Sequence, residues 1–94
     1  MKRLPFIAGN WKMNKTVAEA IDLVKQLKAS LSGVEGVEVV VAPPFTALSA
    51  VRKELEGSPI QLAAQNLFWE EKGAFTGEIA PSMLKEVGCH YVIL

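Results

Sequence analysis

Two side chains suited to binding an anion follow the first apolar run of the chain. Asn10 and Lys12 come directly after Phe6-Ile7-Ala8-Gly9, in a segment that continues as Met13-Asn14-Lys15. A lysine ammonium can bind a phosphate or a developing oxyanion, and an asparagine amide adds a hydrogen-bond donor. A lysine and an asparagine in a loop are usually only solvated, so this pair alone is a weak functional signal. Glycine-rich phosphate loops of the GxGxxG and Walker types do not occur in the sequence.

A second candidate segment runs from Gln65 to Ile79 and contains the aromatic residues Phe68, Trp69 and Phe75. A stretch of this length without regular structure is uncommon in a compact domain unless it is functional. Aromatic side chains on such a loop are typical of protein interfaces. We therefore predict a protein interface here. The alternative is that these side chains cover the core of their own domain.

Composition excludes several classes of protein. Ten basic residues balance ten acidic ones, and a clustered basic excess that would indicate nucleic-acid binding is absent. The apolar runs are too short for a signal peptide or a membrane span, which predicts a cytoplasmic protein without a membrane contact. The single cysteine, Cys89, cannot form an internal disulfide or a cysteine-rich metal site. We predict no metal site.

Four short apolar runs, near residues 5–10, 37–42, 60–65 and 90–94, lack the alternation of a half-buried strand. Length and β-branched content favour strands that are buried on both faces, as in a parallel sheet. Amphipathic segments lie between them, which is the order of right-handed βαβ units. We expect one domain over residues 1–94 with no internal boundary. The pattern alone fits a small open sheet or half of a closed barrel.

Three helices are expected between the strands. The first begins at a capping box formed by Thr16 and Glu19 and stops near Gly33. The second covers residues 46–56, and the third covers residues 81–88. Their predicted inner faces are Val17, Ala20, Ile21, Val24, Leu27 and Leu31 in the first, Ala47, Leu48, Val51 and Leu55 in the second, and Met83, Leu84 and Val87 in the third.

Four segments in order resemble the triosephosphate isomerase family. They are Ala8-Gly9-Asn10-Trp11-Lys12-Met13-Asn14, Val41-Ala42-Pro43-Pro44-Phe45, Ala64-Gln65-Asn66 and Gly73-Ala74-Phe75-Thr76-Gly77-Glu78-Ile79. Together they span the chain and are far more specific than any one of them. The resemblance implies an α/β fold, the N-terminal (βα)₃β portion of a TIM (β/α)₈ barrel of roughly 250 residues.

The same resemblance implies an isomerase of glycolysis and gluconeogenesis that interconverts dihydroxyacetone phosphate and glyceraldehyde 3-phosphate without a cofactor. Lys12 would then supply positive charge to the phosphorylated triose, Asn10 would orient it, and Trp11 would contribute backbone and packing. The family's electrophilic histidine follows the fourth strand, and its general-base glutamate follows the sixth. His90 matches neither position, nor do Glu78 and Glu86, so the chain alone is predicted to be inactive.

The family also forms homodimers in which the third loop of one subunit reaches the first loop of the other. Thr76, with its neighbours Phe75, Gly77 and Glu78, would lie near the partner's first loop, which includes Asn14. Two alternatives remain at this point. The chain could be a half-barrel module for binding or assembly without catalysis of its own, or an unrelated phosphate-binding α/β domain.

Overall fold

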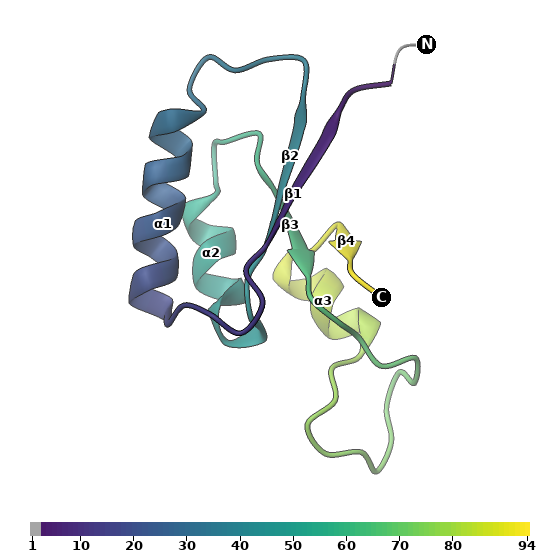
Figure 1. The fold of residues 1–94 in the computed structure, drawn as a ribbon. Helices are drawn as coiled ribbons and strands as arrows, with labels where there is room; N and C mark the ends of the chain where they lie inside the picture. The colour runs from purple at the N-terminus through teal and green to yellow at the C-terminus, as the bar shows by residue number, and fades with distance from the viewer. Residues whose placement is uncertain (1–2) are drawn as a thin grey trace.

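A computed structural model of the chain describes residues 3–94 and shows strands alternating with helices (Figure 1). In chain order the elements are β1 (Phe6–Asn10), α1 (Val17–Ser30), β2 (Glu38–Ala42), the 3₁₀ turn η1 (Phe45–Ala47), α2 (Leu48–Glu54), β3 (Gln61–Ala64), α3 (Pro81–Val87) and β4 (Tyr91–Val92). The strands form one four-stranded sheet in the order β1-β2-β3-β4, and every neighbouring pair is parallel. The predicted parallel sheet is therefore confirmed.

The helices pack against one face of this sheet. Figure 1 shows α1 and α2 side by side along it. Because successive side chains of a strand point to opposite faces, alternate residues of β2 and β3 enter this core. The largest cluster of buried side chains combines strand and helix residues, namely Ala20, Val24, Val41, Ala47, Leu48, Val51, Leu55, Ile60, Leu62, Ala64 and Leu84.

The opposite face of the sheet has only a small cluster of its own. Val40, Ala42 and Ala63 are buried there, with Ile93 packed against them. Toward the edge of the sheet this burial ends, because β1 has a strand neighbour on one side only. All five residues of β1 are exposed, and the exposed fraction of Phe6 is 49%.

Helix α1 begins as its sequence predicts. The backbone N–H of Thr16 donates to Glu19 Oε1 at 2.9 Å, and the N–H of Glu19 donates back to Thr16 Oγ1 at 3.4 Å. The predicted capping box is confirmed. The helix ends at Ser30, before the expected stop at Gly33. Gly33 instead takes a left-handed conformation (φ 82°) in the turn that follows.

The other two helices differ from expectation in detail. The segment predicted at 46–56 opens as η1 and continues as α2, and its four predicted inner residues are all buried. In α3, Leu84 is buried, but Met83 is 53% exposed, so the prediction that Met83 faces inward was wrong. The sulfur of Met83 instead accepts the N–H of Ala80 (3.5 Å), which holds the side chain at the helix start.

Strand β4 is shorter than the predicted run 90–94. Only Tyr91 and Val92 pair with β3 in register. Hydrogen bonds extend the contact by one residue at each end, from the N–H groups of His90 and Ile93 to carbonyls of β3. None of the helices within residues 3–94 has the length and apolar character that crossing a membrane requires.

Candidate functional site

Three parallel strands bring their carboxyl ends to one edge of the sheet. Strand β1 ends at Asn10, β2 ends at Ala42, and Gln65 follows the last residue of β3. The N–H of Trp11 donates to the carbonyl of Ala42 at 3.1 Å, so the loop after β1 is tied to β2 at this edge. In parallel α/β folds the functional groups gather at the carboxyl ends of the strands. The candidate site of this chain lies there.

Asn10 and Lys12, the two residues singled out in the sequence, are joined by a hydrogen bond. The N–H of Lys12 donates to Asn10 Oδ1 at 2.9 Å. Lys12 has a left-handed backbone with φ 55°, a conformation that side chains with a Cβ rarely adopt. Strain of this kind persists only where the surroundings enforce it, and it is found most often at functional sites.

Gln65 supplies a contact that the sequence analysis did not assign to any role. Its side-chain nitrogen Nε2 donates to the carbonyl of Lys12 and to the carbonyl of Ala42, both at 2.8 Å. The only signal in the sequence was its place in the segment Ala64-Gln65-Asn66, directly after an apolar run. The residue connects β3 to the loop after β1.

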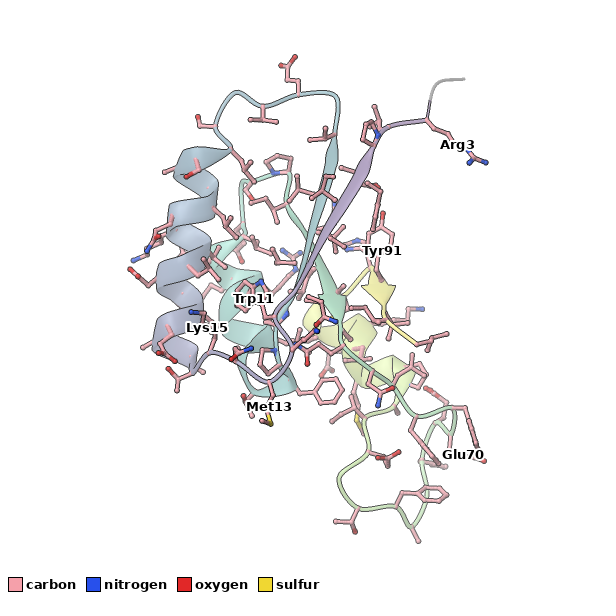
Figure 2. The ribbon with its side chains drawn as sticks, viewed as in Figure 1. Arg3, Trp11, Met13, Lys15, Glu70 and Tyr91 are labelled. Carbon is pink, nitrogen blue, oxygen red and sulfur yellow. The ribbon has the colours of Figure 1, made fainter. Side chains whose placement is uncertain are left out.

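The rest of the loop after β1 is also held by its own side chains. Asn14 Nδ2 donates to the carbonyl of Trp11 at 2.8 Å. The Trp11 side chain is half-buried and packs against the core on the helix side. Figure 2 places Met13 on this loop, where its side chain is 96% exposed. The loop thus has an ordered backbone and an exposed tip.

The site is open and carries an uncompensated positive charge. Both Asn10 and Lys12 are exposed. Within residues 3–94 the one ion pair joins Lys28 to Glu54 at 3.3 Å, so no carboxylate of this part of the chain neutralises the Lys12 ammonium. An ammonium next to an amide on an ordered loop can bind a phosphate or stabilise a developing oxyanion.

Metal-ligating groups do not assemble in the described part of the chain. Residues 3–94 contain no group of three or more histidine, cysteine, aspartate or glutamate side chains placed to hold an ion. Burial raises the pKa of the Cys89 thiol, which favours the neutral thiol over the thiolate that binds metals.

The loop between β3 and α3 forms a separate unit that projects away from the sheet (Figure 1). The N–H of Phe68 donates to the carbonyl of Ile79 at 2.9 Å and closes its neck. Phe68 contacts both Trp69 and Phe75, with ring centroids 5.1 and 4.6 Å apart. The aromatic rings therefore pack on one another. Leu67 and Ile79, at the two ends of the loop, are the residues that pack against the core.

The outer part of this loop is accessible. Trp69 is 80% exposed and Phe75 is 53% exposed, and a hollow of about 150 Å³ lies beside Phe68, Phe75 and Met83. Thr76, Gly77 and Glu78 are exposed as well. Figure 1 shows this loop well apart from the loop after β1. The predicted interface residues Phe75, Thr76, Gly77 and Glu78 thus lie apart from Asn10 and Lys12 within one chain, whereas Asn14 belongs to the loop after β1 itself.

The other candidate acids and bases lie away from the site. His90 is exposed at the start of β4, the end of the strand opposite Asn10 and Lys12, and its N–H bonds to the carbonyl of Leu62 at 2.9 Å. Glu86 is an exposed residue of α3. The structure places neither side chain at the carboxyl edge of the sheet.

Comparison with known proteins gives one consistent match. The sequence model of the family described as "Triosephosphate isomerase" matches residues 5–94. Proteins named triosephosphate isomerase from Endomicrobium trichonymphae and Alkaliphilus oremlandii are 58% and 59% identical to the chain over 92 residues, which is 98% of the chain and 37% of each relative. The crystal structure of triosephosphate isomerase from Bartonella henselae superposes with a TM-score of 0.87 at 39% identity, covering 96% of this chain and 37% of that one. The chain therefore spans just over a third of the length of these relatives.

Proposed function

This chain belongs to the triosephosphate isomerase family, and we propose that it supplies the Lys12 and Asn10 side chains to the interconversion of dihydroxyacetone phosphate and glyceraldehyde 3-phosphate. The observation that carries the proposal is the conformation of Lys12. Its strained backbone is held at the carboxyl edge of the sheet, and its ammonium has no carboxylate partner within residues 3–94. A cation fixed in this way suits a substrate that is a phosphorylated triose.

The chemistry of the isomerisation assigns a role to each side chain. Removing a proton beside the substrate carbonyl places negative charge on the carbonyl oxygen, which gives an enediolate. The Lys12 ammonium stabilises that charge together with the charge of the phosphate. Asn10 accepts the Lys12 N–H through Oδ1, which leaves its Nδ2 group to donate to the substrate. The reaction only relocates protons within one molecule, so the proposal requires no cofactor.

Proton transfer needs a base and an electrophile that we do not assign to this chain. In the family these are a glutamate after the sixth strand and a histidine after the fourth. Glu78, Glu86 and His90 occupy neither place, and we propose that residues 1–94 alone do not catalyse the reaction. We propose further that these residues are one continuous part of a single barrel domain. The exposed β1 and the sparsely covered face of the sheet support this, since further strands would bury both.

The test uses a completed protein, in which this chain is joined after Leu94 to the remaining sequence of the Endomicrobium trichonymphae relative. We expect isomerase activity from it and a fall in kcat/KM of at least about 100-fold for Lys12→Ala, the magnitude expected for loss of a charge-stabilising group. Lys15→Ala is the matched control, because Lys15 is an exposed lysine of the same loop and also has positive φ. It should change kcat/KM by no more than about twofold, since surface substitutions are usually mild. A folded completed protein without activity, or an active Lys12→Ala variant, would contradict the proposal.

We also propose that the complete enzyme is a homodimer in which the loop between β3 and α3 contacts the partner's loop after β1. Thr76 would then lie near the partner's Asn10 and Lys12. The exposed Trp69 and Phe75, the hollow beside Phe75 and the exposed tip at Met13 support a contact of this kind.

This interface is tested by placing a large, charged side chain in it. We expect Thr76→Arg to dissociate the completed protein into monomers in sedimentation experiments and to lower its activity. Ser32→Arg is the control, because Ser32 is exposed in the turn after α1, at the end of the sheet opposite the loop after β1. A dimer that survives Thr76→Arg with its affinity unchanged would argue against this interface.

A further inference from the structure

We infer that Gln65 is the positioning residue for Lys12: one amide nitrogen, bonded to the carbonyls of Lys12 and Ala42, holds the lysine in its left-handed conformation. The inference rests on the role proposed above for the Lys12 ammonium. It adds Gln65, which directly follows β3 and affects the reaction through Lys12.

The backbone of Lys12 is held at both ends. Its N–H donates to Asn10 Oδ1 at 2.9 Å, and its carbonyl accepts from Gln65 Nε2 at 2.8 Å. A left-handed conformation is unfavourable for a residue with a Cβ, so each of these bonds acts against relaxation toward negative φ. With one end released, the carbonyl can rotate and the strain can relax.

The two restraints differ in what they anchor. Asn10 is only two residues from Lys12 and is the last residue of β1, so it ties Lys12 to its own strand. Gln65 is 53 residues away along the chain and follows a different strand. Its second bond, to Ala42, reaches β2, whose last carbonyl also accepts the N–H of Trp11 at 3.1 Å. Through Gln65 the position of Lys12 is therefore fixed relative to β2 and β3 as well.

Glutamine is chemically suited to this place. A side-chain amide has two N–H groups on one nitrogen, and here that nitrogen lies 2.8 Å from each of two carbonyl oxygens. A glutamate carboxylate would place acceptor oxygens against the two carbonyl oxygens, which are also acceptors. An asparagine side chain would be one methylene shorter. A methionine of similar length would have no hydrogen-bond donor. The side chain is half-buried, which limits the ability of water to replace it.

The central variant is Gln65→Met in the completed protein. We expect kcat/KM to fall about 10- to 100-fold and the inhibition constant of inorganic phosphate to rise, the range seen when a group that orients a functional ligand is lost. Gln61→Met is the matched control. Gln61 is a half-buried glutamine at the start of β3, the end of the strand opposite Gln65, and its replacement should leave both constants within about twofold.

A double-mutant cycle separates positioning from general damage to the fold. If Gln65 acts through the Lys12 ammonium, Gln65→Met should lower kcat/KM and weaken phosphate binding only while that ammonium is present. In a Lys12→Ala background it should have little further effect on either quantity. A crystal structure of the Gln65→Met protein should show Lys12 relaxed to negative φ.

Each contrary outcome is specific. Effects of Gln65→Met that add fully to those of Lys12→Ala, an unchanged phosphate inhibition constant, or Lys12 still at positive φ in the variant crystal would overturn the positioning role. None of these touches the proposed function, which fails separately if Lys12→Ala itself leaves kcat/KM unchanged. If the Gln65→Met protein does not fold, Gln65→Glu provides the same cycle with the shape of the side chain preserved.

Discussion

The phenol of Tyr91 donates a hydrogen bond to the carboxylate of Glu38, with Oη 2.9 Å from each carboxylate oxygen. Since β3 lies between β2 and β4, this contact reaches across a strand at the end of the sheet opposite Asn10 and Lys12. Phe6 of β1 packs edge-on against the Tyr91 ring, with centroids 5.3 Å apart. The amino ends of three strands are thus joined by side chains on the face away from the helices.

The Tyr91 contact predicts a shifted titration. The hydrogen bond to Glu38 raises the pKa of Tyr91 above its ordinary value of 10.0, because it requires the protonated phenol. The contact therefore stabilises the fold fully below pH 10 and is lost as the pH rises through the raised pKa. The absorbance change on ionisation, taken as the difference between the completed protein and its Tyr91→Phe variant, should have its midpoint above pH 10. Glu38→Gln should move it back toward 10, and a midpoint at 10 with Glu38 in place would contradict the prediction.

The capping box of α1 predicts a loss of stability on removing its hydroxyl. Thr16→Ala should lower the free energy of unfolding of the completed protein by about 1 kcal/mol, because the N–H of Glu19 loses its acceptor at the helix start. Thr16→Ser keeps the acceptor and should cost much less. Urea unfolding of the three proteins at pH 7 measures both differences, and equal loss in the two variants would show that the hydroxyl is not the cause.

The same capping box predicts a pH dependence with a defined sign. Hydrogen bonds from Thr16 lower the pKa of Glu19 below 4.5; the backbone N–H has the largest effect, and the hydroxyl has the second largest. The ionised carboxylate therefore stabilises the helix start above about pH 4.5, and this contribution disappears as the pH falls through the lowered pKa. Glu19→Ala should be less stable than the parent at pH 7, with a gap that narrows in acid. A gap that stays constant from pH 7 to pH 3 would oppose this assignment.

Replacing Gly88, the residue directly after α3, with alanine should lower the free energy of unfolding in two ways, through backbone strain and through a contact with Arg52. Gly88 has φ 102°, and a Cβ added there would overlap the Arg52 side chain. Gly57 has φ 81° with no atom within 4 Å of such a Cβ, so Gly57→Ala reports backbone strain alone. We expect each alanine to destabilise the completed protein by about 1 kcal/mol through its backbone.

The Arg52 contact should add little to this cost, because the arginine is exposed and its side chain can move. Gly88→Ala should therefore exceed Gly57→Ala by no more than a few tenths of a kcal/mol in urea unfolding. A much larger cost at Gly88 that Arg52→Ala relieves would show instead that the arginine is held in place.

The exposed strand β1 predicts association of the 94-residue chain. Phe6 and Ile7 are 49% and 57% exposed, and the backbone of β1 has a free edge that can pair with another strand. In sedimentation experiments the isolated chain should exceed the mass of a monomer. Adding the remainder of the Endomicrobium trichonymphae relative as a second polypeptide should replace self-association with a defined complex. A compact monomer with a cooperative thermal transition would refute this prediction.

Much of the fold could be predicted from the sequence because its signals are local or periodic. The Thr16 and Glu19 pair lies within one turn of helix, and the inner residues of α2 repeat at helical spacing. Unbroken apolar runs indicated the parallel strands, and glycine marked the left-handed end of α3 at Gly88. The ordered segments around Asn10, Phe45, Gln65 and Thr76 identified the family, since four matches in sequence are specific where each alone is weak.

Only the tertiary structure decided which distant residues meet. Gln65 and Lys12 are 53 residues apart, and so are Tyr91 and Glu38, and neither pair is marked by spacing or residue type. Their contacts depend on the registers of β1 on β2, of β2 on β3 and of β3 on β4, which align the strand ends. The outward position of Met83 likewise depends on the neighbours around it. Periodicity describes how a residue relates to the next turn or the next strand position, whereas register and packing are properties of the assembled sheet.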